Sequence, residues 1–188
     1  TWFRDYVYIP LGGSQGKKRG AIRNTFIVFT LSGLWHGANW TFIIWGALNA
    51  LYFIPLLIAN KNRSHLNTVA EGRFLPSIRE FAQMTLTFCL TLIAWVFFRA
   101  DSVSQALNYL KQMLSMTLLV QPDLIPWRSI IAVALFLSIE WIQRNKQHAL
   151  EVTGISIPGP IRWSIYISIT YCILIFGGKE QEFIYFQF

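Results

Sequence analysis

The fold of this chain is decided by an uncharged stretch at residues 24–60, which reads NTFIVFTLSGLWHGANWTFIIWGALNALYFIPLLIAN. Its 37 residues contain no Asp, Glu, Lys or Arg. A single helix of that length would extend about 56 Å, whereas the hydrocarbon core of a membrane is about 30 Å thick. The stretch therefore predicts two helical pieces with a break between them.

We expect the break at residues 33–37, GLWHG, where two glycines flank Trp35 and His36. Each glycine lowers helix propensity by about 1 kcal/mol relative to alanine. Residues 24–36 would extend only about 20 Å as a helix, which is too short to cross a membrane alone, whereas residues 38–60 are long enough. The pattern predicts a broken or re-entrant helix, with His36 at membrane depth and facing an internal cavity.

Composition places the chain among membrane proteins. Only 13% of the residues are charged and 54% are hydrophobic, whereas a soluble domain has about 25% charged residues. The net charge is +7. The basic residues lie between long apolar runs, as in multispanning membrane proteins. Nucleic-acid binding requires instead that basic residues cluster on one polar face. We therefore expect membrane lipid as a partner and no nucleic acid.

Three further uncharged runs predict more helices, at residues 81–98, 129–139 and 163–178. The first is long enough to span a membrane, and the other two are marginal. Residues 101–120 differ, because apolar side chains recur at helical spacing and polar side chains fall on the opposite face.

This segment is typical of an amphipathic helix at the membrane surface. Ser102 and Gln105 have the capping-box spacing that starts a helix. The predicted fold class is all-α: a polytopic membrane helical bundle with broken or re-entrant helices and an amphipathic surface helix.

His36 is the side chain of the uncharged stretch best suited to chemistry. A neutral imidazole, with an ordinary pKa of about 6.5, accepts a proton from a hydroxyl group, as a general base does in acyl transfer. The alternative is a core histidine bonded to a carbonyl of another helix, and the residues alone leave both open. Since no second His or carboxylate lies at i+3 or i+4, we expect no metal site.

A second candidate region combines residues 2–13, WFRDYVYIPLGG, with the basic run at residues 17–19. A glycine turn beside basic side chains can hold a phosphate, although the pattern fits neither the P-loop nor the dinucleotide motif. The alternative is an anchor near anionic lipid headgroups.

Three motifs in this order resemble the membrane-bound O-acyltransferase family, and within it the bacterial branch of alginate O-acetylation and teichoic acid D-alanylation. They are WFRDYVYIPLGG at residues 2–13, LWHGANWT at 34–41 and AWVFFRA at 94–100. The resemblance runs along the whole chain. It implies that residues 1–188 are the C-terminal part of a single membrane-embedded acyltransferase domain, whose N-terminal half is absent.

The resemblance also implies an activity. Members move an acyl group from a thioester donor to a hydroxyl acceptor. For this chain we expect an acetyl group, donated by acetyl-CoA or another acyl thioester and accepted by an extracellular polysaccharide. We expect no bound cofactor. His36 matches the family's invariant histidine and would be the catalytic general base. Trp35 and Asn39 are near enough in sequence to bind substrate by shaping or hydrogen-bonding the site, and the alternative for either residue is packing. The residues expected to line the donor entrance are Arg4, Tyr8, Gly12 and Gly13.

The expected location is the bacterial inner membrane, crossed several times, with an extracytoplasmic acetyltransferase or another polysaccharide-modification protein as partner. The alternatives are transfer of D-alanyl or another acyl group to a cell-wall polymer, or a non-catalytic channel or export subunit. Glu140 is the sole acid near a span that a channel would use, and its i,i+4 spacing to Arg144 favours an ion pair at a helix end. The sequence therefore favours an enzyme.

Overall fold

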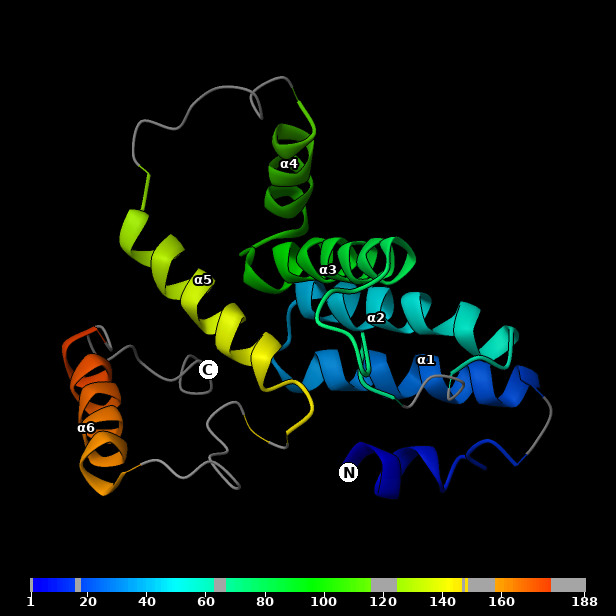
Figure 1. Cartoon of the computed structure of the whole chain (residues 1–188). Helices are drawn as coiled ribbons and strands as arrows, with labels where there is room; N and C mark the ends of the chain where they lie inside the picture. Colours follow the sequence, from blue (N-terminus) through cyan, green and yellow to red (C-terminus); the bar gives the residue numbers. More distant parts are fainter. Residues whose placement is uncertain are drawn as a thin grey trace. The chain divides into compact units, whose positions relative to one another are not determined.

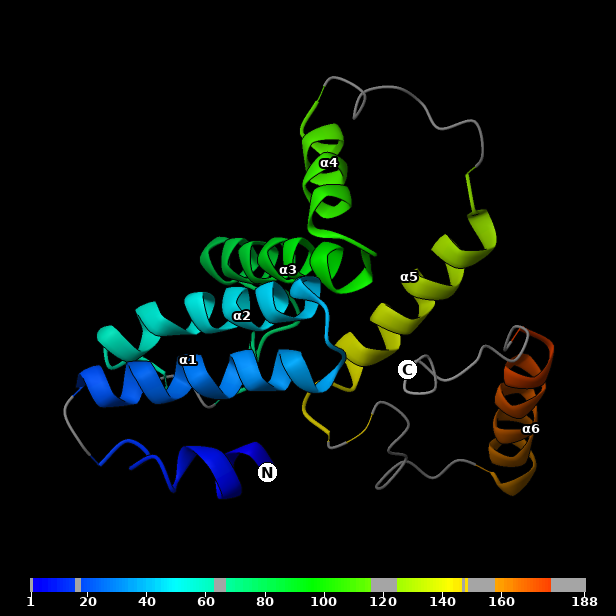
Figure 2. The ribbon, with the colours of Figure 1, turned by 180° about the vertical axis from the view of Figure 1, so that it is seen from behind.

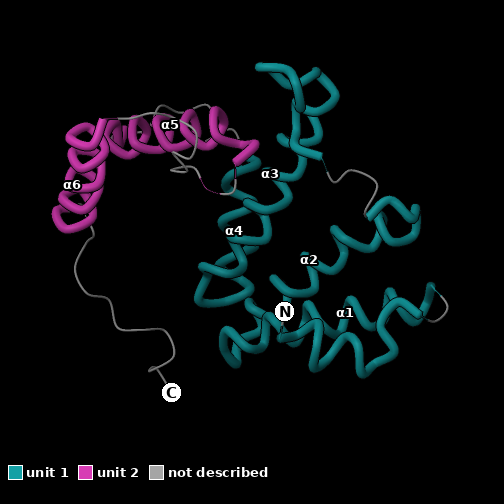
Figure 3. The backbone as a smooth tube through the Cα atoms, turned by 60° about the horizontal axis from the view of Figure 1, so that its bottom comes forward, with its two compact units in different colours: residues 1–123 teal, residues 124–188 magenta. Residues whose placement is uncertain are grey.

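A computed structural model describes residues 2–15, 18–62, 67–115, 125–146, 148 and 158–176, and every regular element within these ranges is helical. The all-α class is therefore confirmed. The chain forms two compact units, residues 1–123 and residues 124–188 (Figure 3). The elements in chain order are η1 Arg4–Tyr8, α1 Lys18–Trp35, α2 Trp40–Ile58, α3 Ile78–Arg99, α4 Val103–Met113, α5 Trp127–Ile142 and α6 Gly159–Phe176.

A break between the two helical pieces is confirmed, and it lies at residues 36–39, because α1 continues through Gly33 to Trp35. The two helices run antiparallel and side by side (Figure 1 and Figure 2). At the far end of the pair, Lys18 Nζ donates to the carbonyl oxygen of Ile58 at 3.2 Å. The helix α1 begins at Lys18, before the predicted start at residue 24, and its 18 residues extend about 27 Å. Lys and Arg are good helix formers, so the helix extends beyond the apolar run.

Two glycines bring α1 and α2 into backbone contact. A Cβ atom added at Gly33 would overlap the carbonyl oxygen of Phe42, and one added at Gly46 would overlap the carbonyl oxygen of Phe29. Small residues allow this approach wherever apolar helices pack in a membrane. The pair of glycines thus fixes how the end of α1 lies against the start of α2.

Within the described residues, two helices are long and apolar enough to cross a membrane, namely α2, with a mean hydropathy of 1.9, and α3, with 1.8. They correspond to the predicted spans at residues 38–60 and 81–98. The two marginal runs form α5, with 16 residues, and α6, with 18. The polytopic arrangement and a re-entrant path for α1 remain predictions.

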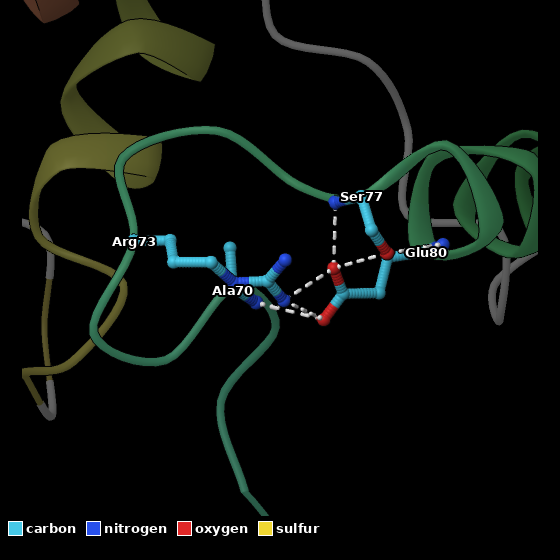
Figure 4. A network of polar contacts seen from close by, with 4 residues as sticks. All are labelled: Ala70, Arg73, Ser77 and Glu80. Atoms are coloured by element: carbon cyan, nitrogen blue, oxygen red, sulfur yellow. Dashed lines mark hydrogen bonds and ion pairs between the residues drawn. The ribbon is translucent and has the colours of Figure 1, made fainter.

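A polar network fixes the start of α3 to the loop before it (Figure 4). Ser77 Oγ accepts from the Glu80 backbone N–H at 3.3 Å, and the Glu80 carboxylate accepts from the Ser77 N–H at 2.7 Å, which completes a capping box. The same carboxylate accepts from Arg73 at 2.9 Å and from the Ala70 N–H at 3.3 Å. One side chain therefore satisfies the helix terminus and the loop together.

The amphipathic segment forms α4, which turns sharply away from α3 (Figure 1). It begins where the sequence predicted, since Ser102 Oγ accepts from the Gln105 N–H at 3.2 Å. Gln105 Oε1 accepts from the Asp101 N–H at 2.7 Å. The 11 residues of α4 extend about 16 Å, too short to span. Residues 116–120 of the predicted segment lie outside the described residues.

We expect cysteine labelling to place α4 along the membrane surface. The test replaces Cys89 and Cys172, which are free, and then introduces single cysteines along α4 in the complete protein. Positions 104, 108 and 111 are exposed and should react with a membrane-impermeant maleimide from one side, whereas position 106 is buried and should not. Uniform protection of residues 105–112 would contradict a surface location.

In the second unit, Arg144 lies at the C-terminal end of α5. Its Nη1 donates to the Trp141 carbonyl at 2.8 Å, and its guanidinium lies 4.5 Å from the centre of the Trp141 ring. The predicted pair with Glu140 is absent from the ion pairs of the described residues. The last carbonyls of a helix have no partner within it, so a nearby cation satisfies one of them and stacks on the ring.

Candidate functional site

The turn between α1 and α2 carries the candidate base. The helix closes with two i→i−3 bonds, in which the N–H groups of His36 and Gly37 donate to the carbonyls of Gly33 and Leu34 at 3.0 and 3.1 Å. Gly37 has a φ of +155°, and a Cβ atom there would come within 2.7 Å of the Phe42 ring. Only glycine therefore fits this backbone without strain.

Three aromatic rings surround the imidazole of His36. The ring centres of Phe98, Trp45 and Phe42 lie 5.1, 5.5 and 6.3 Å from that of His36. Phe98 and Trp45 meet the imidazole edge-on, at interplanar angles of 77° and 89°. His36 is half-buried. We name these four residues the His36 cluster; a cavity beside it remains a prediction.

Trp35 lies outside the His36 cluster, although it precedes His36 in sequence. Its side chain is 63% exposed, and its ring centre lies 6.2 Å from Trp2 and 6.3 Å from Phe3. It therefore joins the end of α1 to the N-terminal segment. On this geometry Trp35 contributes to the packing of that segment.

Asn39 links the turn to a distant part of the chain. Its side-chain oxygen accepts from the Thr41 N–H at 3.1 Å and so caps α2, while its Nδ2 donates to the Asp101 carbonyl at 3.0 Å. Asp101 lies just beyond the end of α3, two residues after Arg99. Asn39 therefore connects the turn and the start of α2 to the end of α3, and its role in a site stays a prediction.

The residues predicted for the donor entrance come together in a second place. The turn after η1 uses the positive φ values of Gly12 and Gly13, +96° and +53°. The buried Asn24 of α1 holds this turn by donating to the carbonyls of Leu11 and Gly13 at 2.9 and 3.2 Å. A pocket of about 240 Å³ is lined by Arg4, Tyr8, Ile9, Gly12, Gly13, Ser14 and Gln15.

Charges at this pocket are partly paired. Arg4 Nε donates to Asp5 Oδ1 at 2.7 Å, and this bond raises the pKa of the guanidinium and lowers the pKa of the Asp5 carboxyl. Of the basic run, Lys18 is bound to Ile58 at the end of α2, and Lys17 lies outside the described residues. Among the described residues that line this pocket, Arg4 is the cation.

Sequence reasoning missed the role of the aromatic residues around His36. Phe98 belongs to the AWVFFRA motif, whose spacing carried the resemblance but gave no role to any one ring. Trp45 lies nine residues after His36, and nothing in its spacing links it to the imidazole. Only helix packing brings α3 against the start of α2.

Within the described residues, no group of three or more metal-ligating side chains occurs.

Relatives of this chain bear names that describe O-acetyl transfer. It is 38% identical over 115 residues to the peptidoglycan O-acetyltransferase of Helicobacter pylori and 37% identical over 115 residues to the probable alginate O-acetylase AlgI of Pseudomonas aeruginosa. Each match covers 61% of this chain and 20% of the relative. The AlgI protein of Pseudomonas syringae is 41% identical over 106 residues, covering 56% of this chain and 18% of the relative.

This chain thus spans about a fifth of the length of the curated relatives it matches. No solved structure matches it. The sequence model of the membrane-bound O-acyltransferase family matches residues 1–98, more than half of the 188 residues. This match includes η1, α1, α2 and nearly all of α3, and therefore both the His36 cluster and the pocket at Gly12 and Gly13. This chain belongs to the membrane-bound O-acyltransferase family.

Proposed function

We propose that this chain forms part of an enzyme that transfers an acetyl group from a thioester donor to hydroxyl groups of an extracellular polysaccharide. The observation that carries the proposal is the position of His36, half-buried in the turn that joins two packed helices. The names of the bacterial relatives, which describe O-acetyl transfer to peptidoglycan or alginate, support the acetyl group and the polysaccharide acceptor.

His36 is the proposed general base. Its imidazole takes the proton of the acceptor hydroxyl as the oxygen attacks the thioester carbonyl carbon. The carbon–sulfur bond then breaks, and the leaving thiolate receives the proton from the imidazolium. The products are an O-acyl ester and a free thiol, so atoms and charge balance. The neutral form of an imidazole is the form that accepts a proton.

The pocket at Gly12 and Gly13 is the proposed donor entrance. Acetyl-CoA, the donor we propose, carries phosphate groups, and the Arg4 guanidinium at the pocket rim is 66% exposed. A guanidinium forms paired hydrogen bonds with phosphate oxygens. To bind phosphate in this way, Arg4 must give up part of its hydrogen bonding to Asp5.

On this proposal, residues 1–188 are the C-terminal part of a single acyltransferase domain of the bacterial inner membrane, which crosses the membrane several times. The apolar helices α2 and α3 support membrane insertion. An extracytoplasmic acetyltransferase or another polysaccharide-modification protein is the proposed partner, because an acyl group carried across the membrane needs an acceptor on the far side.

The proposal is tested with the complete protein in inside-out membrane vesicles. Acetyl-CoA with a labelled acetyl group is supplied at the cytoplasmic face, and the polysaccharide fraction is then analysed for label that mild alkali releases as acetate. We expect label in ester linkage. Label from a D-alanyl thioester but none from acetyl-CoA would favour the cell-wall alternative, and no transfer from any acyl thioester would contradict the proposal.

A further inference from the structure

Asn39 is hydrogen-bonded to the residue after the C-cap of α3, the helix that carries Phe98 to the imidazole of His36. We propose that Asn39 is a positioning residue, which fixes the imidazole of His36 by anchoring the end of α3 and with it the ring of Phe98. This inference deepens the proposed function, because it rests on His36 as the general base. It also replaces the expectation that Asn39 binds substrate.

The hydrogen bonds of Asn39 define its orientation. A backbone N–H only donates and a carbonyl only accepts, so the side-chain oxygen must face Thr41 N and the side-chain nitrogen must face Asp101 O. The two bonds are 3.1 and 3.0 Å long. The second bond joins Asn39 to Asp101, which lies 62 residues further along the chain. The Asn39 side chain therefore connects the turn after α1 to the junction of α3 and α4.

The anchored junction carries Phe98 into the His36 cluster. Phe98 lies in the last turn of α3, three residues before Asp101. Its ring centre lies 5.1 Å from His36, 5.1 Å from Phe42 and 5.2 Å from Trp45. Phe98 thus contacts every other ring of the cluster. A shift of the α3 end would disturb the ring contact that α3 makes with His36.

The geometry of the rings explains why such a shift would affect catalysis. Phe98 and Trp45 meet the imidazole nearly at right angles, so rotation of His36 about its side-chain bonds would drive it into one ring or the other. Catalysis requires the basic nitrogen to lie within hydrogen-bond reach of the acceptor hydroxyl, and a displacement of about 1 Å can lower the rate about 100-fold.

Two substitutions separate the two hydrogen bonds of Asn39. Asn39→Asp and Asn39→Ser both keep an N-cap for α2, because Asp, Asn and Ser cap helices about equally well. Both remove the bond to Asp101: the carboxylate cannot donate, and the serine hydroxyl is too short to reach. Serine adds no charge, so agreement between the two variants excludes an effect of the carboxylate itself.

We expect both variants, made in the complete protein, to lower kcat about 10- to 100-fold and to change KM by less than about twofold. A substrate-binding role would instead raise KM. The matched control is Ser102→Ala, which removes the cap of α4 one residue after Asp101 but leaves the Asn39 bond intact. We expect wild-type kcat from this control.

A double-mutant cycle tests whether Asn39 acts through Phe98. If it does, the variant with both Asn39→Ser and Phe98→Leu has the same activity, within about threefold, as the less active of the two single variants. Fully additive losses would overturn the proposal. Elution of every variant at the wild-type volume in size-exclusion chromatography confirms that the comparison concerns folded protein.

A readout independent of activity separates this inference from the proposed function. Diethylpyrocarbonate modifies imidazoles, and peptide mass spectrometry gives the rate at His36 alone. We expect both Asn39 variants to raise that rate several-fold and Ser102→Ala to leave it unchanged. An unchanged rate in both Asn39 variants overturns the positioning role even if the assay of acyl transfer fails for another reason.

Discussion

The substitution His36→Ala in the complete protein is expected to abolish acyl transfer and to leave membrane insertion intact. Removal of a general base costs about 100- to 10,000-fold in rate. His36 is half-buried between aromatic rings, so alanine also leaves a gap in the cluster. His36→Gln keeps a polar side chain of similar size without a basic nitrogen, and it should lose activity to a similar extent.

The measurement is kcat/KM for labelled acetyl transfer at matched protein levels in membranes. The control is His148→Ala, because His148 is exposed in the second unit, and its loss should change the rate by less than about twofold. If His36→Gln kept activity within about threefold of wild type, His36 would be excluded from the chemistry.

The second large effect is expected from Gly33→Ala. A Cβ atom at Gly33 overlaps the carbonyl group of Phe42, and a backbone carbonyl in a helix cannot rotate away as a side chain can. α1 and α2 must therefore separate. Overpacking of this kind costs about 1–3 kcal/mol, and we expect a lower apparent melting temperature in detergent. Since His36 follows within one turn, we also expect activity to fall about tenfold or more.

Gly20→Ala is the matched control in the same helix. A Cβ atom there meets nothing within 4 Å, so the change gains helix propensity, about 1 kcal/mol, without steric cost. We expect an equal or higher melting temperature and unchanged activity. If Gly33→Ala proved as stable and active as Gly20→Ala, the tight contact between α1 and α2 would have no energetic role.

Patterns in the sequence predicted the helical pieces well, because they depend on local properties. Apolar length identified α2 and α3, and the glycines around His36 identified the break. The helix α1 begins earlier than predicted, because the boundary of an uncharged run marks a change in solvent exposure and not the boundary of a helix. The predicted ion pair of Glu140 with Arg144 is wrong because the Arg144 guanidinium donates to the Trp141 carbonyl, a contact that the i,i+4 spacing does not reveal.

The candidate site was predictable only in part. His36 stood out as the one basic side chain in an uncharged stretch. Arg4, Tyr8, Gly12 and Gly13, which are close in sequence, line one pocket, and their role at a donor entrance stays a prediction. Trp35 was grouped with His36 for the same reason, yet its ring packs on Trp2 and Phe3 instead. Neighbouring residues at a helix end point in different directions, so adjacency in sequence does not imply a shared site.

The sequence by itself determined the helical class, the apolar spans, the break at His36 and the family, since all of these follow from residue type and order along the chain. Only the tertiary structure decided which rings surround His36 and that Asn39 reaches Asp101 across 62 positions. Contacts of this kind depend on how α1, α2 and α3 pack, and Gly33 and Gly46 allow the close approach of α1 and α2. Steric fit between distant segments leaves no periodic signal in the sequence, because it becomes defined only when the backbones meet.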